Sequence, residues 1–231
     1  FTATPKHSLT PKKAGMNDFD VYGKVICQVP APELVDGGYI LAPKVNVRQL
    51  PISKDRNNWQ RDADYLFETI KEDKKDQVLV CARTTKQIIN VIQNTDFVES
   101  IKKIGYSWLV ITSKTGAIID GHKVTREEFF DTLNTWGKDP SKKFIVLHHS
   151  ILSEGINVNG LQSVIFLRNM DYVGISQTIG RVIRLGGDTK TYGLVTIPTY
   201  DNVGISTARK VQAVVDVIFN KGEAAISEIT R

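Results

Sequence analysis

The sequence has 231 residues, of which 41% are hydrophobic and 24% charged, ordinary values for a globular protein of one or two domains. No apolar stretch approaches the roughly eighteen residues of a membrane-spanning helix, and no signal peptide opens the sequence, so we expect a cytoplasmic protein. The formal net charge of +5 favours a polyanionic partner without identifying it. Cys27 and Cys81 fit no disulfide or metal-ligand framework and the histidines make no zinc site, so no metal site is predicted.

The first fifty residues lack a regular pattern. Residues 1–5 resemble the end of a buried strand with nothing before it to pair with, which indicates a piece of a longer polypeptide. A polar, turn-rich loop is expected over 6–18. The pattern then predicts a strand over 21–29, a helical turn from Pro32 that stops at Gly37, and an extended segment over 40–50. We interpret residues 1–50 as a connector between two bodies.

From residue 59 onward, helical and strand patterns alternate. Short apolar runs predict strands over residues 78–82, 107–111, 144–147, 163–167 and 192–197. Helical spacing predicts helices over residues 59–70, 85–94, 96–104, 125–137, 177–184 and 203–220. Thr125 is expected to cap its helix, with Glu128 at the capping-box position. The alternation predicts an α/β fold, a parallel sheet covered by helices on both faces. It covers residues 51–200, with a helical extension over 201–231.

One edge of this sheet is a candidate binding surface, because ligands on such sheets gather at the carboxyl ends of the strands. The residues that follow three of the expected strands are small, hydroxylated or basic, as contacts to phosphate require: Arg83, Thr84, Thr112, Ser113, Lys114, His148, His149 and Ser150. Solvated loops produce a polar edge as well, so this pattern alone does not decide the function.

The pattern Q-x-x-G-R-x-x-R, formed by Gln177, Gly180, Arg181 and Arg184, is the most informative feature. On a helix, the glutamine and the two arginines fall at i, i+4 and i+7 and share one face. Two guanidinium groups and an amide without an acid are suited to clamping phosphate oxygens. A solvated basic helix face whose arginines pair with acids elsewhere is the alternative.

Four segments together resemble motifs of superfamily 2 helicases and translocases: residues 1–5, 78–84, 150–157 and 177–184. The sequence Q-T-I-G-R-V-I-R is similar to the corresponding motif of phage recombination helicases. Residues 20–40 resemble the connector of restriction-enzyme motors. The resemblance implies that residues 51–200 form the second RecA-like lobe, the C-terminal helicase domain. Residues 1–50 would then contain the end of the first lobe and the connector.

The resemblance also implies roles for individual residues. ATP and Mg²⁺ would sit between the two lobes of the full-length protein, with neither bound tightly to this chain alone. Arg184 would be the arginine finger, Arg181 its partner on the phosphates, and Gln177 the residue that orients them. Glu154, Gly155 and Asn157 would line the nucleotide cleft. Contacts to the backbone of DNA, with RNA possible, would come from Arg83, Thr84, Thr112, Ser113, Lys114, His149 and Ser150.

The sequence departs from the family in several places. It contains no G-x-x-x-x-G-K-[ST] loop and no D-E-x-[HD] motif, so the chain alone should not hydrolyse ATP. His148 and His149 stand where the family places a threonine, and Asn157 replaces the commoner aspartate. A non-catalytic α/β module that binds a nucleotide or a partner, and an RNA helicase lobe, remain as alternatives. Another phosphate-handling enzyme is disfavoured, because no strand ends in a Gly-rich loop that opens a helix.

Overall fold

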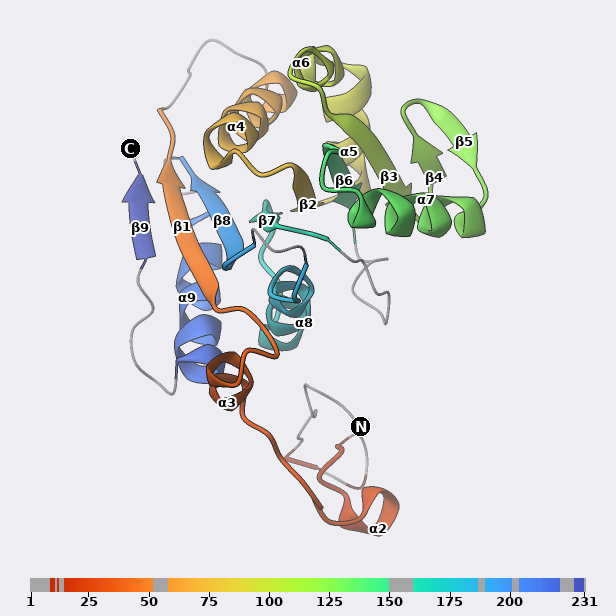
Figure 1. Ribbon diagram of the computed structural model, residues 1–231. Coiled ribbons are helices and arrows are strands. Elements are labelled where there is room, and N and C mark those ends of the chain that lie inside the picture. The colour runs from red at the N-terminus through yellow and green to blue at the C-terminus, as the bar shows by residue number, and fades with distance from the viewer. Residues whose placement is uncertain are drawn as a thin grey trace.

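The computed structural model describes residues 9–10, 12, 15–51, 58–149, 160–186, 190–200, 204–220 and 227–230. Within them, one mixed sheet has the strand order β5-β4-β3-β6-β2-β7-β8-β1-β9 (Figure 1). The strands are β1 (Pro43–Gln49), β2 (Gln77–Cys81), β3 (Ser107–Thr112), β4 (Gly116–Ile119), β5 (His122–Val124), β6 (Phe144–His148), β7 (Ser163–Phe166), β8 (Gly193–Thr199) and β9 (Ser227–Thr230). The β3–β4 and β4–β5 pairs are antiparallel, and the others are parallel. The predicted α/β class is confirmed.

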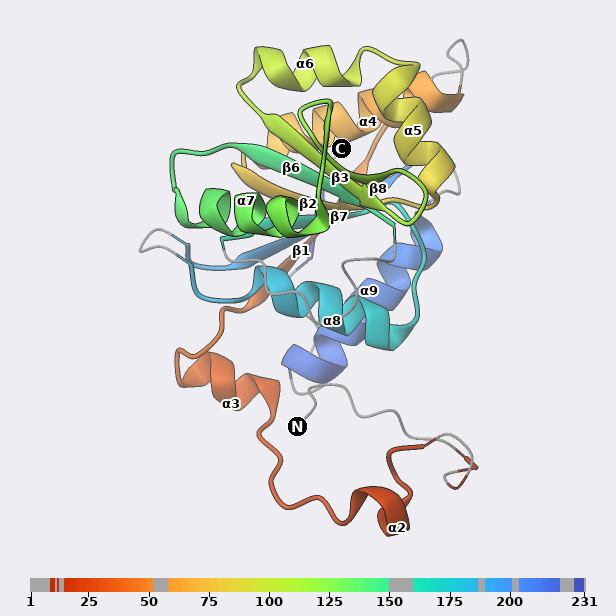
Figure 2. The same ribbon diagram turned by 90° about the vertical axis from the view of Figure 1, so that its right-hand side faces the viewer.

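Helices cover both faces of the sheet (Figure 2). One face packs against α4 (Asn58–Asp73), α5 (Thr85–Gln93) and α6 (Phe97–Lys103), the other against α7 (Arg126–Lys138), α8 (Tyr172–Val182) and α9 (Ile205–Phe219). Alternate residues of a strand serve opposite faces: in β2, Val78 and Val80 belong to the first core and Leu79 and Cys81 to the second. The continuous apolar runs of the sequence follow from this two-sided burial.

Helices α5, α7 and α8 begin at side-chain caps. Thr84 accepts a hydrogen bond from the backbone N–H of Gln87 at 3.0 Å, and Thr125 accepts one from Glu128 at 3.1 Å. Asp171 does the same for Gly174 at 2.7 Å. Each bond satisfies a backbone donor in the first turn that has no partner within the helix. The predicted cap at Thr125 is confirmed.

The predicted strand over residues 21–29 is wrong. Asp18 caps a short helix, α2 (Phe19–Tyr22), and residues 23–30 form neither helix nor strand. Val25 and Ile26 are exposed and pair with no described strand, so their β-propensity has no ladder to join. This segment runs away from the sheet toward α2 in both Figures 1 and 2.

The rest of the expected connector adjoins the sheet. The predicted helical turn is α3 (Ala31–Asp36), followed by Gly37 as expected, and the extended segment becomes β1, which pairs with β8 and β9. Pro43 is the first residue of β1, where the loss of one donor is tolerated. Helix α9, in the expected C-terminal extension, packs its apolar face on the sheet as well.

The sequence analysis missed the β4–β5 hairpin. Asp120 and Gly121 form its turn with φ angles of 46° and 96°, both in the left-handed region. An Asp-Gly pair between apolar residues is a strong hairpin signal, since such turns require positive φ at both positions. This signal was present in the sequence.

Candidate functional site

Helix α8 carries the Q-x-x-G-R part of the arginine motif. Gln177 is exposed and Arg181 is buried, while Ile179 and Val182 pack into the core as predicted. The helix ends at Val182, so Arg184 lies beyond it and is half-buried. The prediction that all three side chains share one helix face is therefore correct for Gln177 and Arg181 and wrong for Arg184.

Cations gather at the carboxyl end of α8. The pKa of Arg181 is lowered, first because the side chain is buried and second because the Arg184 guanidinium is near. The Lys190 ammonium donates to the carbonyls of Arg184 at 2.6 Å and Leu161 at 2.8 Å. Burial lowers the pKa of Lys190 to about 8. Positive groups are favourable at a helix C-terminus, and their concentration here creates a field suited to an anion.

His148 is buried in the interior, near Arg181, and is not on the exposed edge of the sheet. Its Nε2 lies 3.2 Å from Sγ of Cys81, and both residues are buried. Burial and the nearby Arg168 and Arg181 lower the pKa of His148 to about 3. Burial raises the pKa of Cys81 to about 12. Both side chains are therefore neutral near pH 7, and neither is a candidate nucleophile or phosphate contact.

The structure brings the other predicted edge residues together, because β3, β6 and β2 are neighbours in the sheet and run parallel. Ser113 and Lys114 are exposed after β3. Thr112 is buried, and its hydroxyl accepts from the backbone N–H groups of Lys114 and Thr115. Its role in the structure is to close the β3–β4 turn. His149, after β6, is half-buried.

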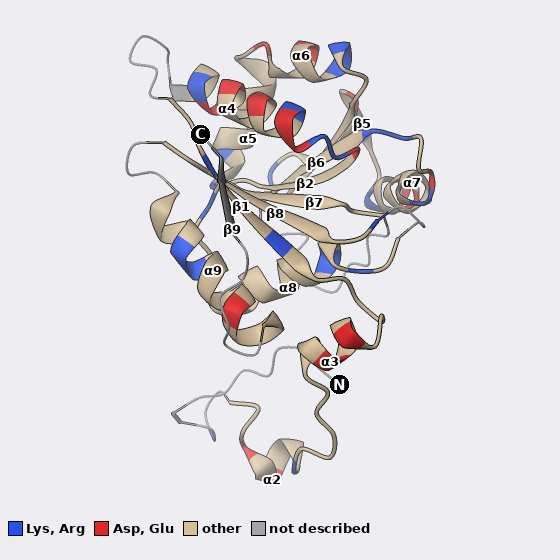
Figure 3. Cartoon of the chain, turned by 60° about the vertical axis from the view of Figure 1, so that its left-hand side comes forward, with Lys and Arg blue, Asp and Glu red and all other residues tan. Residues whose placement is uncertain are grey.

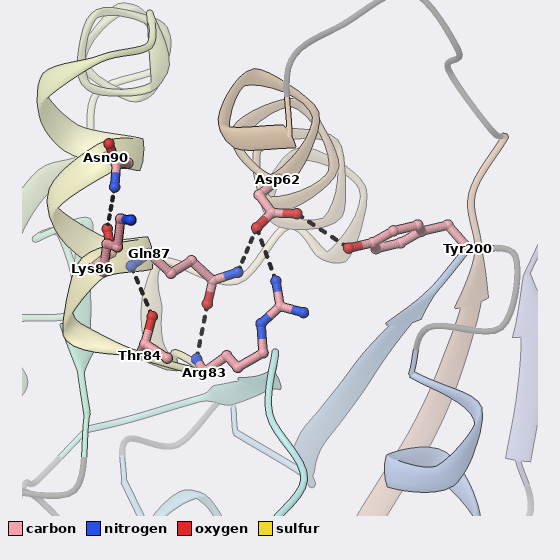
Figure 4. Close-up of polar contacts among 7 residues, drawn as sticks. All are labelled: Asp62, Arg83, Thr84, Lys86, Gln87, Asn90 and Tyr200. Carbon is pink, nitrogen blue, oxygen red and sulfur yellow. Dashed lines mark hydrogen bonds and ion pairs between the residues drawn. The ribbon is translucent and has the colours of Figure 1, made fainter.

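Arg83, after β2, belongs to a polar network around Asp62 on α4 (Figure 4). The buried Asp62 carboxylate accepts from Gln87 Nε2 at 2.6 Å, from the Tyr200 hydroxyl at 3.1 Å and from the Arg83 guanidinium at 3.5 Å. The Oε1 of Gln87 accepts the backbone N–H of Arg83 at 2.8 Å. Both the backbone and the side chain of Arg83 are thereby held, while 52% of the side chain stays exposed.

Sequence reasoning missed Asp62, Tyr200 and Arg168. Asp62 and Tyr200 are 138 positions apart, and no local pattern pairs them. Arg168 follows β7 at the same sheet edge, so the rule that identified Arg83 could have found it. It lies with Gln177 along an open hollow of about 410 Å³ between the end of β7 and α8.

Four predicted site residues, Ser150, Glu154, Gly155 and Asn157, lie outside the described residues. Among the residues that are described, no three His, Cys, Asp or Glu side chains form a group that could hold a metal ion. No helix in this part of the chain is long and apolar enough to cross a membrane. Basic and acidic residues are interspersed along α4, and α3 carries acids (Figure 3), so local clusters matter more than the net charge.

Comparison with solved structures shows the same fold. The chain matches the ATP-dependent Type ISP restriction-modification enzyme LlaBIII bound to DNA, with a TM-score of 0.70 and 17% identity over 99% of this chain and 19% of that one. It matches a putative HsdR subunit of a type I restriction enzyme from Vibrio vulnificus YJ016, with a TM-score of 0.63 and 14% identity over 91% of this chain and 40% of that one. It also matches the DExH-box NTPase HrpB of E. coli, with a TM-score of 0.51 and 12% identity over 73% of this chain and 20% of that one.

The chain thus spans well under half the length of these structures. No curated protein sequence matches it. Residues 61–186, more than half of the chain, match the family described as "Helicase conserved C-terminal domain". This range contains Asp62, Gln87 and Arg83, the strand ends of the sheet edge and the arginine motif, whereas Tyr200 lies beyond it. The chain belongs to the helicase conserved C-terminal domain family and is a superfamily 2 helicase C-terminal domain with a RecA-like fold.

Proposed function

We propose that this chain is the C-terminal lobe of an ATP-dependent DNA helicase or translocase. The observation that carries the proposal is the pair Arg181 and Arg184 at the carboxyl end of α8. The two guanidinium groups are close enough that Arg184 lowers the pKa of Arg181. A triphosphate beside them would relieve this repulsion and would be clamped by planar donor groups.

In this proposal the arginines act on ATP held between this lobe and a first RecA-like lobe of the same polypeptide. Bound ATP supplies the γ-phosphoryl group that is transferred to water. Arg184 stabilises the charge that develops on that group, Arg181 holds the phosphates, and Gln177 orients the arginines. Glu154, Gly155 and Asn157 would line the cleft. The donor set around α8 is cationic and fits the phosphates but not Mg²⁺, so the first lobe would supply the carboxylate for the metal.

The sheet edge would contact the nucleic-acid backbone. Ser113 and Lys114 are exposed, and Arg83 presents half of its side chain while Asp62 restrains the guanidinium. Contacts of this type hold the backbone and do not read the sequence. The preference for DNA over RNA is supported by the LlaBIII structure, which is bound to DNA.

The test compares the purified chain with a polypeptide that contains both lobes. Alone, the chain should show negligible Mg²⁺-dependent ATP hydrolysis, because its sequence lacks the phosphate-binding loop. It should bind DNA weakly, with a log–log salt slope of roughly −2 to −4. The two-lobe polypeptide should hydrolyse ATP. Robust turnover by the chain alone would contradict the proposal, and salt-independent binding would favour a partner-binding module.

A further inference from the structure

A pocket lies at the carboxyl ends of the neighbouring strands β2 and β7, where the connecting helices switch from one face of the sheet to the other. The chain leaves β2 through α5 on one face of the sheet, and it leaves the neighbouring β7 through α8 on the other. In open α/β sheets, ligands bind outside the carboxyl ends of the strands at such a point. The pocket has a volume of about 210 Å³ and is lined on the β2 and β7 sides by Arg83 and by residues 166–169.

The pocket has an aromatic and apolar wall. Tyr65 of α4 and Tyr200 after β8 contribute to it, with their ring centroids 4.7 Å apart. Phe166, Leu167 and Pro198 extend the apolar surface. Aromatic side chains at the edge of a nucleic-acid site offer stacking surfaces that accept any base.

Two guanidinium groups, of Arg83 and Arg168, line the same pocket, against the single carboxylate of Asp62. Asp62 accepts hydrogen bonds from Gln87 and Tyr200 and pairs with Arg83 at 3.5 Å, which leaves Arg168 without a carboxylate partner in the pocket lining. The Nε of Arg168 is buried and has no hydrogen-bond partner among the described residues. The aromatic and apolar wall suits a planar apolar group, and the two arginines suit an anion attached to it. A nucleotide has both parts, a base and a phosphate.

We propose that the pocket takes one base of the bound strand, with the flanking phosphates on Arg83 and Arg168. This inference rests on the proposed function, since it assumes that a strand lies along the sheet edge. It adds a base contact to an interface that otherwise holds only the backbone. Stacking of this type does not depend on which base is present, so the contact is tolerant of sequence.

The test uses two single strands of equal length on the two-lobe protein: one of thymidine nucleotides and one with every base removed. The wild-type protein should bind the thymidine strand at least about fivefold more tightly, the lower end expected for one stacked base. Ser206→Trp introduces an indole at a residue that lines the pocket and should reduce this ratio to about one. Ile205→Trp, at an exposed neighbour that does not line the pocket, should leave it unchanged.

Arg168→Gln should weaken the binding of both strands and preserve their ratio, because it removes a phosphate contact. It tests the phosphate contact beside the pocket, while the wild-type comparison of the two strands tests the base contact even if Ser206→Trp does not fold. Equal binding of the two strands by the wild-type protein would overturn the base pocket while leaving the proposed function intact. An unchanged ratio in Ser206→Trp would overturn it too, and failure to bind either strand would overturn both proposals. The same pair made as RNA shows which strand the pocket favours.

Discussion

Two arginine environments in the structure differ in what surrounds the guanidinium. Arg83 is held by Asp62 and half exposed, whereas Arg181 is buried with the guanidinium of Arg184 as the neighbour that lowers its pKa. The first arrangement is balanced within the lobe and presents a fixed cation at the surface. The second places two guanidinium groups near each other, one buried and one half-buried. We propose that Arg83 serves binding and that the α8 cluster (Arg181, Arg184 and Lys190) serves chemistry.

The largest effect expected on stability concerns His148, which is buried near Arg168 and Arg181. Its folded pKa of about 3 is below the ordinary value of 6.5, so its contribution to stability is complete above pH 6.5 and is lost as the pH falls toward 3. The loss should be about 1.4 kcal/mol per pH unit in this window. Urea unfolding at pH 7.5 and 5.5 should show a smaller pH dependence for His148→Gln than for wild type.

His122→Gln, at an exposed histidine of β5, is the control and should retain the wild-type pH dependence. Equal pH dependence in all three proteins would show that His148 titrates normally and is not held neutral by burial and the nearby arginines. An NMR titration of the His148 ring gives the same information without a mutation, since its pKa should lie near 3, far below the ordinary value of 6.5.

An intermediate effect tests the Arg83 region. Arg83→Ala should weaken DNA binding about tenfold and reduce the salt slope by roughly one, as expected for one charged contact. Asp62→Asn should weaken binding less, because it frees the guanidinium without removing it. In the Arg83→Ala background, Asp62→Asn should have no further effect on affinity. Tighter binding by Asp62→Asn would mean that the carboxylate competes with the strand instead of positioning Arg83.

The smallest effect concerns Gly180, which lies between Gln177 and Arg181 in the motif. A Cβ built there meets no atom within 4 Å, so nothing in the described lobe requires glycine. Gly180→Ala should stabilise the chain by about 1 kcal/mol and raise the melting temperature by about 2–4 °C. If the nucleotide or the first lobe approaches this position, turnover of the two-lobe protein should fall.

Gly174 provides the matched control on the same helix. Its Cβ would lie 2.9 Å from Oδ1 of the cap Asp171 and 2.9 Å from Cε of Met170, so these side chains must shift and Gly174→Ala should stabilise the chain less than Gly180→Ala does. A Gly180→Ala protein with higher stability and unchanged turnover would show that no group packs against this part of α8.

The sequence predicted those parts of the fold that follow from local patterns. The apolar runs of β2, β3, β6, β7 and β8 are buried on both sides, and a buried parallel strand has that composition. Residues 21–29 are also rich in β-branched residues, but no strand among the described residues lies beside them, and the pattern cannot show whether a partner exists. The Asp62 network joins α4, α5 and the end of β8, so it depends on tertiary packing that no local spacing encodes.

The site was predicted unevenly for a related reason. The arginine motif was visible because its residues lie on and just after one helix. The difference between Arg181 and Arg184 was not, because α8 ends at Val182 and only the structure shows it. Thr112 was selected for its place after a strand, yet its hydroxyl closes a turn. A polar residue at a strand end serves the fold or a ligand, and the sequence pattern is the same in both cases.

The central claim is that the α8 cluster serves chemistry and Arg83 serves binding. Turnover of the two-lobe protein at saturating DNA, measured for Arg184→Ala and Arg83→Ala, tests it most directly. Arg209→Ala, at an exposed position of α9, is the control. Arg184→Ala should lower turnover on the order of 10³-fold or more, with melting temperature and DNA affinity nearly unchanged. The turnover of Arg83→Ala at saturating DNA should stay within about tenfold of the wild-type turnover. Turnover of Arg184→Ala within about tenfold, a barrier change of about 1.4 kcal/mol, would contradict the claim.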